Sequence, residues 1–166
     1  MIVRWGLGEL EGALSDLGVS RPFLLATGRH TDVPRHVGRW SDLPTDDVAA
    51  VVAELGNADV LVALGGGSTI DAAKAVSAET SLPLLSIPTT YSGAEWTSFF
   101  GVRDGERRQR GGGAGANVAA IVYEPELTLD LPRAETVGTA LNALAHCAEA
   151  LYVEGHNERA DTEALV

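Results

Sequence analysis

Three segments of the chain are almost continuously apolar, and they cover residues 22–28, 59–64 and 82–87. Unbroken apolar runs, rather than alternating ones, are typical of strands in a parallel sheet that is covered on both faces. Elsewhere, apolar residues at helical spacing and helix-start signals predict helices at residues 8–17, 46–55, 68–78 and 132–153. Strands that alternate with helices in this way predict an α/β fold with an open, mostly parallel, Rossmann-like sheet flanked by helices.

Polar and glycine-rich segments predict the connections between these elements. Residues 29–44 are polar and contain prolines, so we expect a loop there, with Thr45 as the N-cap of the next helix. Residues 96–102 and 118–123 are expected to form two further strands. The segment between these two strands contains an Asp-Gly pair and three consecutive glycines, which favours a hairpin with a mobile loop.

The long helix predicted at residues 132–153 differs from the others because nothing follows it that could cover it. Leu141, Leu144 and Leu151 recur on a common side of this helix. We therefore interpret it as the beginning of a second, all-helical domain that is truncated here. This interpretation divides the chain into an α/β domain at residues 1–131 and the start of a helical domain at residues 132–166.

Composition excludes several classes of protein. The 12 basic and 23 acidic residues give a formal net charge of −11, which disfavours binding to the phosphates of nucleic acid. No stretch reaches the roughly 20 apolar residues of a membrane span. Cys147 is the single cysteine, so no intrachain disulfide can form, which suits the reducing cytoplasm. We expect a cytoplasmic protein that acts on a small molecule.

A glycine-rich loop is the strongest candidate binding site in the sequence. Gly65, Gly66, Gly67 and Ser68 follow a predicted buried strand and open a predicted helix. Glycine lets a ligand approach the backbone closely, and the free N–H groups and dipole of a helix N-terminus favour an anion. The loop matches neither the G-x-G-x-x-G pattern nor a P-loop. It predicts a pyrophosphate site, although a tight turn without a ligand is the alternative.

A second loop, residues 88–95, follows the next predicted strand and is rich in hydroxyl groups. Thr89, Thr90 and Ser92 can each donate or accept hydrogen bonds. Ligands in open α/β sheets bind outside the carboxyl ends of the strands, so this loop and the glycine loop should flank one crevice. A capped turn without a ligand is the alternative for this segment.

These motifs together resemble the iron-containing alcohol dehydrogenases. The resemblance rests on Gly-Gly-Gly-Ser at residues 65–68 and on Pro-Thr-Thr-Tyr-Ser-Gly-Ala-Glu at residues 88–95. The second motif, with residues 123–129 and 142–152, is similar to the maleylacetate reductase subgroup of that superfamily. The resemblance covers most of the chain from about residue 59 to residue 152. It implies a dehydroquinate synthase-like fold, in which an N-terminal α/β domain binds NAD or NADP and a helical domain closes the substrate cleft.

The resemblance also implies roles for particular residues. Ser68 and the three glycines before it would contact the cofactor diphosphate, and Thr89, Thr90 and Ser92 would line the nucleotide. The strand end at residues 27–28 lies where the protein would contact the adenosine ribose of the cofactor. No acidic residue stands directly there, so the choice between NAD and NADP stays open. Asn142 and His146 would face the substrate.

The pair Asn142 and His146 also bears on metal binding. Metal-dependent members carry Asp-x-x-x-His on this helix, and residues four apart lie on one helix face. An amide is a weaker metal ligand than a carboxylate, so we expect no bound metal.

The activity that the resemblance implies is NAD(P)-dependent hydride transfer to maleylacetate, giving 3-oxoadipate. The arginines that could attract such a dicarboxylate are Arg103, Arg107, Arg108 and Arg110.

Two alternatives remain open from the sequence. One is a metal-dependent alcohol dehydrogenase of the same superfamily, which Asn142 disfavours. The other is a nucleotide-binding fragment that is inactive without its helical domain. In that case the apolar stripe of the last long helix would bind a partner helical domain or a second copy of the chain as a homodimer.

Overall fold

The computed structural model describes residues 1–30, 34–45, 47–104, 107–112 and 116–165, and within 103–110 it describes the backbone alone. The strands are β1 (Ile2–Trp5), β2 (Pro22–Ala26), β3 (Gly38–Trp40), β4 (Val60–Gly65), β5 (Leu84–Pro88), β6 (Phe99–Asp104), β7 (Arg107–Gly112) and β8 (Val118–Tyr123). The helices are α1 (Leu10–Asp16), α2 (Val48–Glu54), α3 (Gly67–Thr80), α4 (Arg133–Ala150) and α5 (Glu158–Ala164). Short 3₁₀ turns are η1 (Leu7–Glu9), η2 (Ala94–Trp96) and η4 (Pro125–Thr128).

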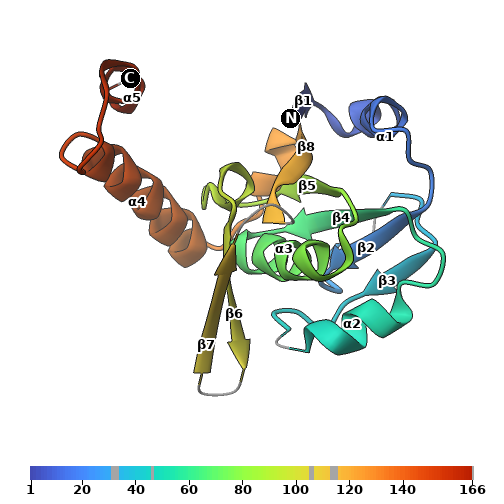
Figure 1. Ribbon diagram of the computed structural model, residues 1–166. Coiled ribbons are helices and arrows are strands. Elements are labelled where there is room, and N and C mark those ends of the chain that lie inside the picture. The colour runs from blue at the N-terminus through green and yellow to red at the C-terminus, as the bar shows by residue number, and fades with distance from the viewer. Residues whose placement is uncertain (31–33, 46, 105–106, 113–115, 166) are drawn as a thin grey trace.

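In the described part of the chain, the main sheet has six strands in the order β1-β8-β5-β4-β2-β3 (Figure 1). All of its pairings are parallel. The central strands β4 and β5 are buried along their whole length, as their unbroken apolar sequences require. The prediction of an open, parallel α/β sheet is therefore confirmed.

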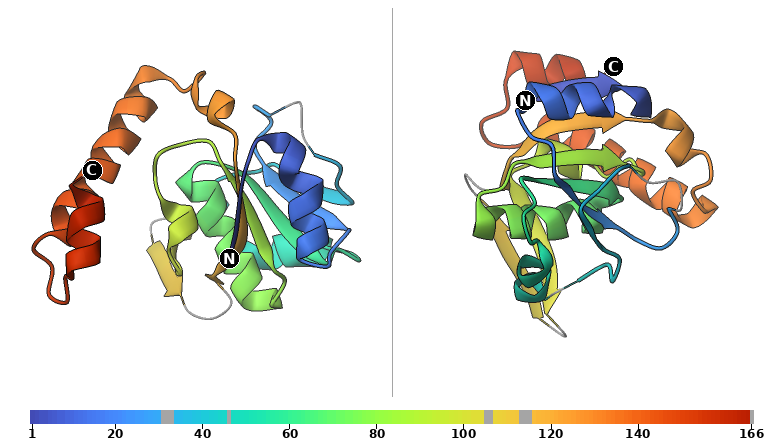
Figure 2. Two further views of the ribbon diagram at one scale, coloured as in Figure 1. Left: turned by 90° about the horizontal axis from the view of Figure 1, so that it is seen from above. Right: turned by 90° about the vertical axis from the view of Figure 1, so that its right-hand side faces the viewer.

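Helices cover both faces of this sheet, and the right-hand view of Figure 2 shows α1 on one side and α2 and α3 on the other. Successive strand residues point to opposite faces, so β2 and β4 contribute to two separate cores. One core packs Leu14 of α1 against Leu24 and Val62. The other packs Ile70 of α3 and Val51 of α2 against the opposite face. The site described below lies where the strands between these two layers end.

The prediction of a hairpin between residues 96–102 and 118–123 is wrong. Strand β6 instead pairs antiparallel with β7, outside the main sheet. Strand β8 joins the main sheet, between β5 and β1. Its residues Val118, Ala120, Ile121 and Val122 are buried, which explains why this apolar segment belongs to the parallel core rather than to an exposed ribbon.

Two short edge strands and one helix cap also differ from the sequence-based expectations. Residues 2–5 form β1, for which no strand was expected, and residues 38–40 form β3 inside the expected loop 29–44. Edge strands are short and half-exposed, so they lack the long apolar run that identifies a buried strand. Asp47, rather than Thr45, caps α2, because its carboxylate accepts a hydrogen bond from the N–H of Ala50 at 2.9 Å.

Helix α4 projects away from the α/β layers, with α5 beyond it (Figure 1). None of its residues is buried, and Leu141 and Leu144 are 59% and 64% exposed. The apolar stripe expected on this helix is therefore real and uncovered in this chain. The division into domains at residues 131 and 132 stays a prediction. Among the described residues, no helix combines the length and the apolar character that a membrane crossing requires.

Candidate functional site

The two loops singled out in the sequence lie side by side at the carboxyl edge of the sheet. Strands β4 and β5 are adjacent, and Gly65 at the end of one is in register with Pro88 at the end of the other. The N–H of Thr89 then donates to the carbonyl oxygen of Gly65 at 3.1 Å, which holds together the starts of the two loops that follow these strands. The expectation that both loops flank one crevice follows directly from this pairing.

The contacts between these loops explain why glycine occupies Gly66 and Gly67. A Cβ atom on Gly66 would lie 2.9 Å from Cγ2 of Thr90, and one on Gly67 would lie 3.0 Å from Oγ of Ser92. Neither position is strained, since the φ of Gly66 is −80°. Glycine therefore accommodates the close approach of the second loop at both positions and leaves the backbone accessible to a ligand.

The N-terminus of α3 begins inside this glycine loop and carries no side-chain cap. The N–H groups of Thr69 and Ile70 donate to the carbonyl oxygen of Gly66 at 3.0 and 3.1 Å. The first N–H groups of a helix, here those of Gly67 and Ser68, have no intrahelical acceptor and are available to an anion. Beside them, Oγ1 of Thr90 is buried without a hydrogen-bond partner. The residues present thus fit the diphosphate and adjoining groups of a dinucleotide.

A buried lysine joins helix α3 to the segment after β5. Lys74 of α3 is 0% exposed. Its Nζ donates to the carbonyl oxygen of Ala94, to Oγ1 of Thr97 at 3.0 Å and to the carbonyl oxygen of Phe99 at 2.9 Å. Burial lowers the Lys74 pKa, and the negative charge of Asp71, 3.8 Å from Nζ, opposes that shift. Asp71 also accepts a hydrogen bond from the N–H of Gly101 at 3.0 Å.

A second chain of polar contacts runs from an exposed residue of η2 to a buried one. The indole N–H of Trp96 donates to the hydroxyl of Tyr123 at 2.6 Å, and that hydroxyl donates to Oε1 of Glu95 at 2.9 Å. Burial raises the Tyr123 pKa, and the neighbouring Glu95 carboxylate raises it further. Glu95 is 5% exposed, and its Oε2 is buried without a hydrogen-bond partner. Sequence reasoning did not assign Lys74 or Tyr123 to the site; the alanines on both sides of Lys74 were the available signal that this part of α3 is buried.

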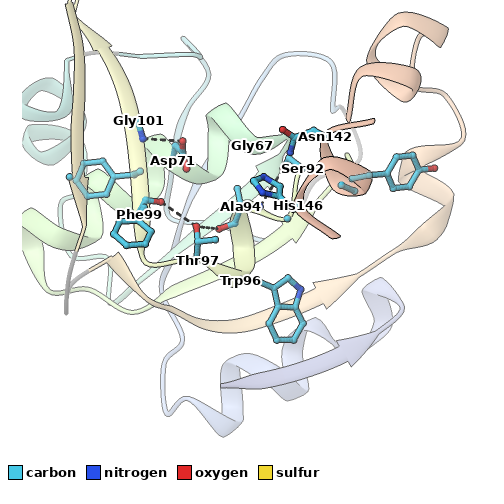
Figure 3. A pocket seen from close by; sticks show the side chains of 15 residues that line it. Gly67, Asp71, Ser92, Ala94, Trp96, Thr97, Phe99, Gly101, Asn142 and His146 are labelled. Atoms are coloured by element: carbon cyan, nitrogen blue, oxygen red, sulfur yellow. Dashed lines mark hydrogen bonds between the residues drawn. The ribbon is translucent and has the colours of Figure 1, made fainter. Parts of the chain in front are cut away.

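The loops open into a cleft of about 940 Å³ between the carboxyl edge and α4 (Figure 3). Gly67 and Ser92 line its loop side, and Asn142 and His146 line its helix side. Figure 3 shows Asn142 and His146 turned from α4 toward the loop that carries Ser92. Nδ1 of His146 lies 3.4 Å from Oε2 of Glu149, and both side chains are more than half exposed. The cleft is therefore open to solvent.

The structure brings some of the predicted site residues together and places others beside the cleft. Gly67, Ser92, Asn142 and His146 share it. The other five do not line it: Gly65 ends β4, Gly66 lies against Thr90, Thr89 is 5% exposed, and Ser68 lines a smaller hollow of about 350 Å³. Their roles in binding and catalysis stay predictions.

Two further sequence-based predictions concern charge and metal. The side chains of Arg103, Arg107, Arg108 and Arg110 lie outside the described residues, so their proposed contact with a dicarboxylate stays untested. Over the described ranges, no three His, Cys, Asp or Glu side chains gather into a group that could hold a metal ion.

Comparisons with known proteins identify the family of the chain. The family model for iron-containing alcohol dehydrogenases matches residues 31–125. Maleylacetate reductase from Pseudomonas knackmussii is 39% identical over 161 residues, which covers 88% of this chain and 46% of that protein. The crystal structure of maleylacetate reductase from a Rhizobium species superimposes with a TM-score of 0.88 and 32% identity, over 99% of this chain and 52% of that one. A sulfoacetaldehyde reductase from Bifidobacterium kashiwanohense, solved with NAD⁺, shares the fold at a TM-score of 0.87 and 20% identity.

This chain thus spans about half the length of the relatives that it matches. The half that it covers contains the parallel sheet, the glycine loop and the first helices after the sheet. The family match extends over more than half of the chain and includes both loops of the cleft. The chain belongs to the iron-containing alcohol dehydrogenase family.

Proposed function

We propose that this chain is the dinucleotide-binding part of an NAD(P)H-dependent reductase that converts maleylacetate to 3-oxoadipate. The observation that carries the proposal is the cleft in which the N-terminus of α3, at Gly67, faces Asn142 and His146 of α4. The similarity to maleylacetate reductases over 88% of the chain supports the choice of substrate.

The cofactor would be NADH or NADPH, bound along the carboxyl edge. The N–H groups of Gly67 and Ser68 would hold its diphosphate at the positive end of α3. The unpaired Oγ1 of Thr90 would hydrogen-bond to the same part of the cofactor, since it lies beside Gly66. When bound, the nicotinamide supplies the hydride, while the protein supplies orientation and charge.

The substrate would occupy the cleft between the loop after β5 and α4. The side-chain amide of Asn142 can donate to a substrate carboxylate, and His146 can donate a proton when protonated. His146 is 65% exposed, so it can exchange that proton with solvent. Reduction of a carbon–carbon double bond consumes one hydride and one proton, and His146 is our candidate for delivering the proton.

We also propose that no tightly held metal takes part, because Asn142 stands where a carboxylate ligand would be needed. An amide oxygen carries no charge to hold a divalent ion. We expect the protein to act on a small-molecule substrate and to bind neither nucleic acid nor a membrane. We expect it to be located in the cytoplasm. We expect either a second copy of the chain, in a homodimer, or a helical domain to pack against α4.

The test begins with binding and ends with turnover. The chain should bind NADH or NADPH, measured by fluorescence transfer from tryptophan to the reduced nicotinamide, and should oxidise it when maleylacetate is added. His146→Ala and Asn142→Ala should each lower turnover at least about tenfold, as is usual when a positioned acid or substrate contact is lost, with little change in cofactor affinity. His156→Ala is the matched control, since His156 is another exposed histidine, paired with Asp161.

A chain that binds dinucleotide and turns over nothing is the second candidate. The exposed Leu141 and Leu144 favour it, because an uncovered apolar face leaves one wall of the cleft incompletely supported. Binding without turnover would select this candidate. The absence of binding to either dinucleotide would exclude both functions.

A further inference from the structure

Trp96 is an exposed aromatic residue in the wall of the cleft. It lies in η2, lines the cleft and is 58% exposed. In Figure 3 its indole ring lies at the opposite end of the drawn residues from Gly101. Tyr91, Phe99 and Phe100 line the same cleft. An indole ring beside a cleft offers a ligand a large apolar face together with a polar N–H group.

The backbone on both sides of Trp96 is held in place by Lys74. Nζ of Lys74 donates to the carbonyl oxygen of Ala94 and to Oγ1 of Thr97, the second at 3.0 Å. The N–H of Trp96 donates to the carbonyl oxygen of Gly93 at 3.0 Å, which closes the turn on itself. The backbone from which the indole projects is therefore fixed before any ligand binds.

The indole ring itself is fixed by a chain of hydrogen bonds. Its N–H donates to the hydroxyl of Tyr123 at 2.6 Å, and that hydroxyl donates to Oε1 of Glu95 at 2.9 Å. The chain ends on a buried carboxylate, since Glu95 is buried in the described structure. Ordering a mobile side chain at a binding site costs affinity, so a ring that is already held binds a ligand at a smaller cost.

The charges that line the cleft do not account for this aromatic wall. Among the described residues of the lining, His146 is the one basic side chain and Asp71 carries the one carboxylate. Lys74 is fully buried, and its three donors are taken up by protein acceptors. The described part of the loop side therefore suits a flat apolar group better than it suits a carboxylate.

We infer that Trp96 determines specificity in the cleft by packing its indole against the flat, conjugated part of an unsaturated substrate, with Tyr123 and Glu95 as positioning residues that act through it. The inference rests on the proposed function and names the part of the substrate that the site recognises. In maleylacetate the double bond is conjugated with a carboxylate and a ketone, so this part is flat. The product 3-oxoadipate has the same two carboxylates and ketone on a flexible, saturated chain.

The first experiment is a calorimetric titration of the full chain with maleylacetate and with 3-oxoadipate. Reduced cofactor is left out, so nothing turns over. We expect maleylacetate to bind about fivefold or more tightly than 3-oxoadipate, the size of effect that a well-placed aromatic contact produces. Trp96→Leu should weaken maleylacetate binding about fivefold and change 3-oxoadipate binding less than about twofold. Tyr152→Leu removes another exposed aromatic ring, outside the cleft lining, and should change neither affinity.

The second experiment tests the positioning role of Tyr123. The chain has three tryptophans, so the background Trp5→Phe/Trp40→Phe leaves Trp96 as the source of tryptophan fluorescence. In this background Tyr123→Phe removes the acceptor of the indole N–H, and we expect lower fluorescence anisotropy of Trp96 because the ring gains freedom. Maleylacetate binding should weaken about threefold, the cost of ordering one side chain, while 3-oxoadipate binding stays within about twofold.

The outcomes separate this inference from the proposed function. Equal affinities of the unmodified chain for the two acids, no binding of either, or equal losses in Trp96→Leu would overturn the inference and leave dinucleotide binding intact. Unchanged anisotropy in Tyr123→Phe would overturn the positioning role. If neither NADH nor NADPH binds to the unmodified chain, the proposed function fails and the inference fails with it.

Discussion

Nζ of Lys74 on α3 donates a hydrogen bond to the carbonyl oxygen of Phe99 on β6 at 2.9 Å, across 25 residues of sequence. The same amine also holds Ala94 and Thr97, so one buried cation fixes three points of the segment that lines the cleft. The three donors of the ammonium group are thereby matched by three protein acceptors. Helix α3, which begins in the glycine loop, and the segment that forms a wall of the cleft are therefore joined through a single side chain.

We expect Lys74→Met to lower the free energy of unfolding by about 3 kcal/mol, because it leaves three acceptors unpaired in a buried site, at about 1 kcal/mol or more each. Thr97→Val removes one of the three contacts and should cost about 1 kcal/mol. Urea denaturation followed by tryptophan fluorescence measures both changes. A Lys74→Met variant as stable as the unmodified chain would show that the lysine does not hold this segment.

Gly66→Ala tests the close packing of the two loops. The added Cβ would lie 2.9 Å from Cγ2 of Thr90, and we expect a loss of about 2 kcal/mol from this overpacking. Thr90→Ser removes the clashing methyl group and keeps the hydroxyl, so the double variant Gly66→Ala/Thr90→Ser should regain part of the lost stability. Thermal unfolding of the two single variants and the double variant measures this coupling. Additive effects would contradict the contact.

The control for that experiment is Gly138→Ala on α4. No atom lies within 4 Å of a Cβ placed at this position. Alanine is favoured over glycine in a helix interior by about 1 kcal/mol, so this variant should be as stable as the unmodified chain or more stable. A destabilising Gly138→Ala would mean that α4 packs differently from the arrangement described above.

The central part of the site could be predicted from the sequence because its signals are local. Strands β4 and β5 are buried on both faces, so each appears as an unbroken apolar run, and each is followed at once by its loop. The neighbouring positions of Gly66 and Thr90 then follow from the rule that parallel strands end at one edge of the sheet. Asn142 and His146 depended on the family resemblance, because helical spacing alone places them on one face but not in the cleft.

The rest could not be predicted because it depends on contacts that are distant in the sequence. Strand β8 looks the same in sequence whether it pairs with β6 or with β5, and only its burial in the completed sheet decides between them. Arg39 stabilises the turn after β2 from a strand of three residues that has no apolar run. From the sequence alone, Lys74 would be expected to be exposed on its helix. It is buried because η2 and β6 pack over it.

Tyr123 predicts a distinct behaviour at alkaline pH. Its pKa is raised in the folded protein by burial and by Glu95, so it should remain protonated above pH 10, near which tyrosine normally ionises. A group with a raised folded pKa stabilises the fold below its unfolded pKa and loses that contribution as pH rises through its folded pKa. The stability difference between the unmodified chain and Tyr123→Phe should therefore be about 1–2 kcal/mol at pH 8 and shrink above about pH 10.

Absorbance titration of the phenolate gives an independent measurement of the same group. Tyr123→Phe should remove the phase that ionises at the highest pH. Tyr152→Phe should retain it, because Tyr152 is 77% exposed and lies beyond the end of α4. If the late phase persisted in Tyr123→Phe, the hydrogen-bonded chain from Trp96 through Tyr123 to Glu95 would not control this ionisation.

Asn142→Asp tests whether the helix side of the cleft can be converted into a metal site. Asn142 and His146 are four residues apart on α4, and both line the cleft, so a carboxylate at the first position would share one face with the imidazole. Replacing the neutral amide with a charged oxygen ligand should raise zinc affinity by roughly tenfold or more. Competition with a zinc-binding dye measures the change in the full chain. The double variant Asn142→Asp/His146→Ala should lose the gain, because a single carboxylate leaves the ion without its nitrogen ligand. If Asn142→Asp gains no affinity, or the double variant retains the gain, the two side chains do not converge on a common point in the cleft, and their proposed joint role at the substrate would have to be abandoned.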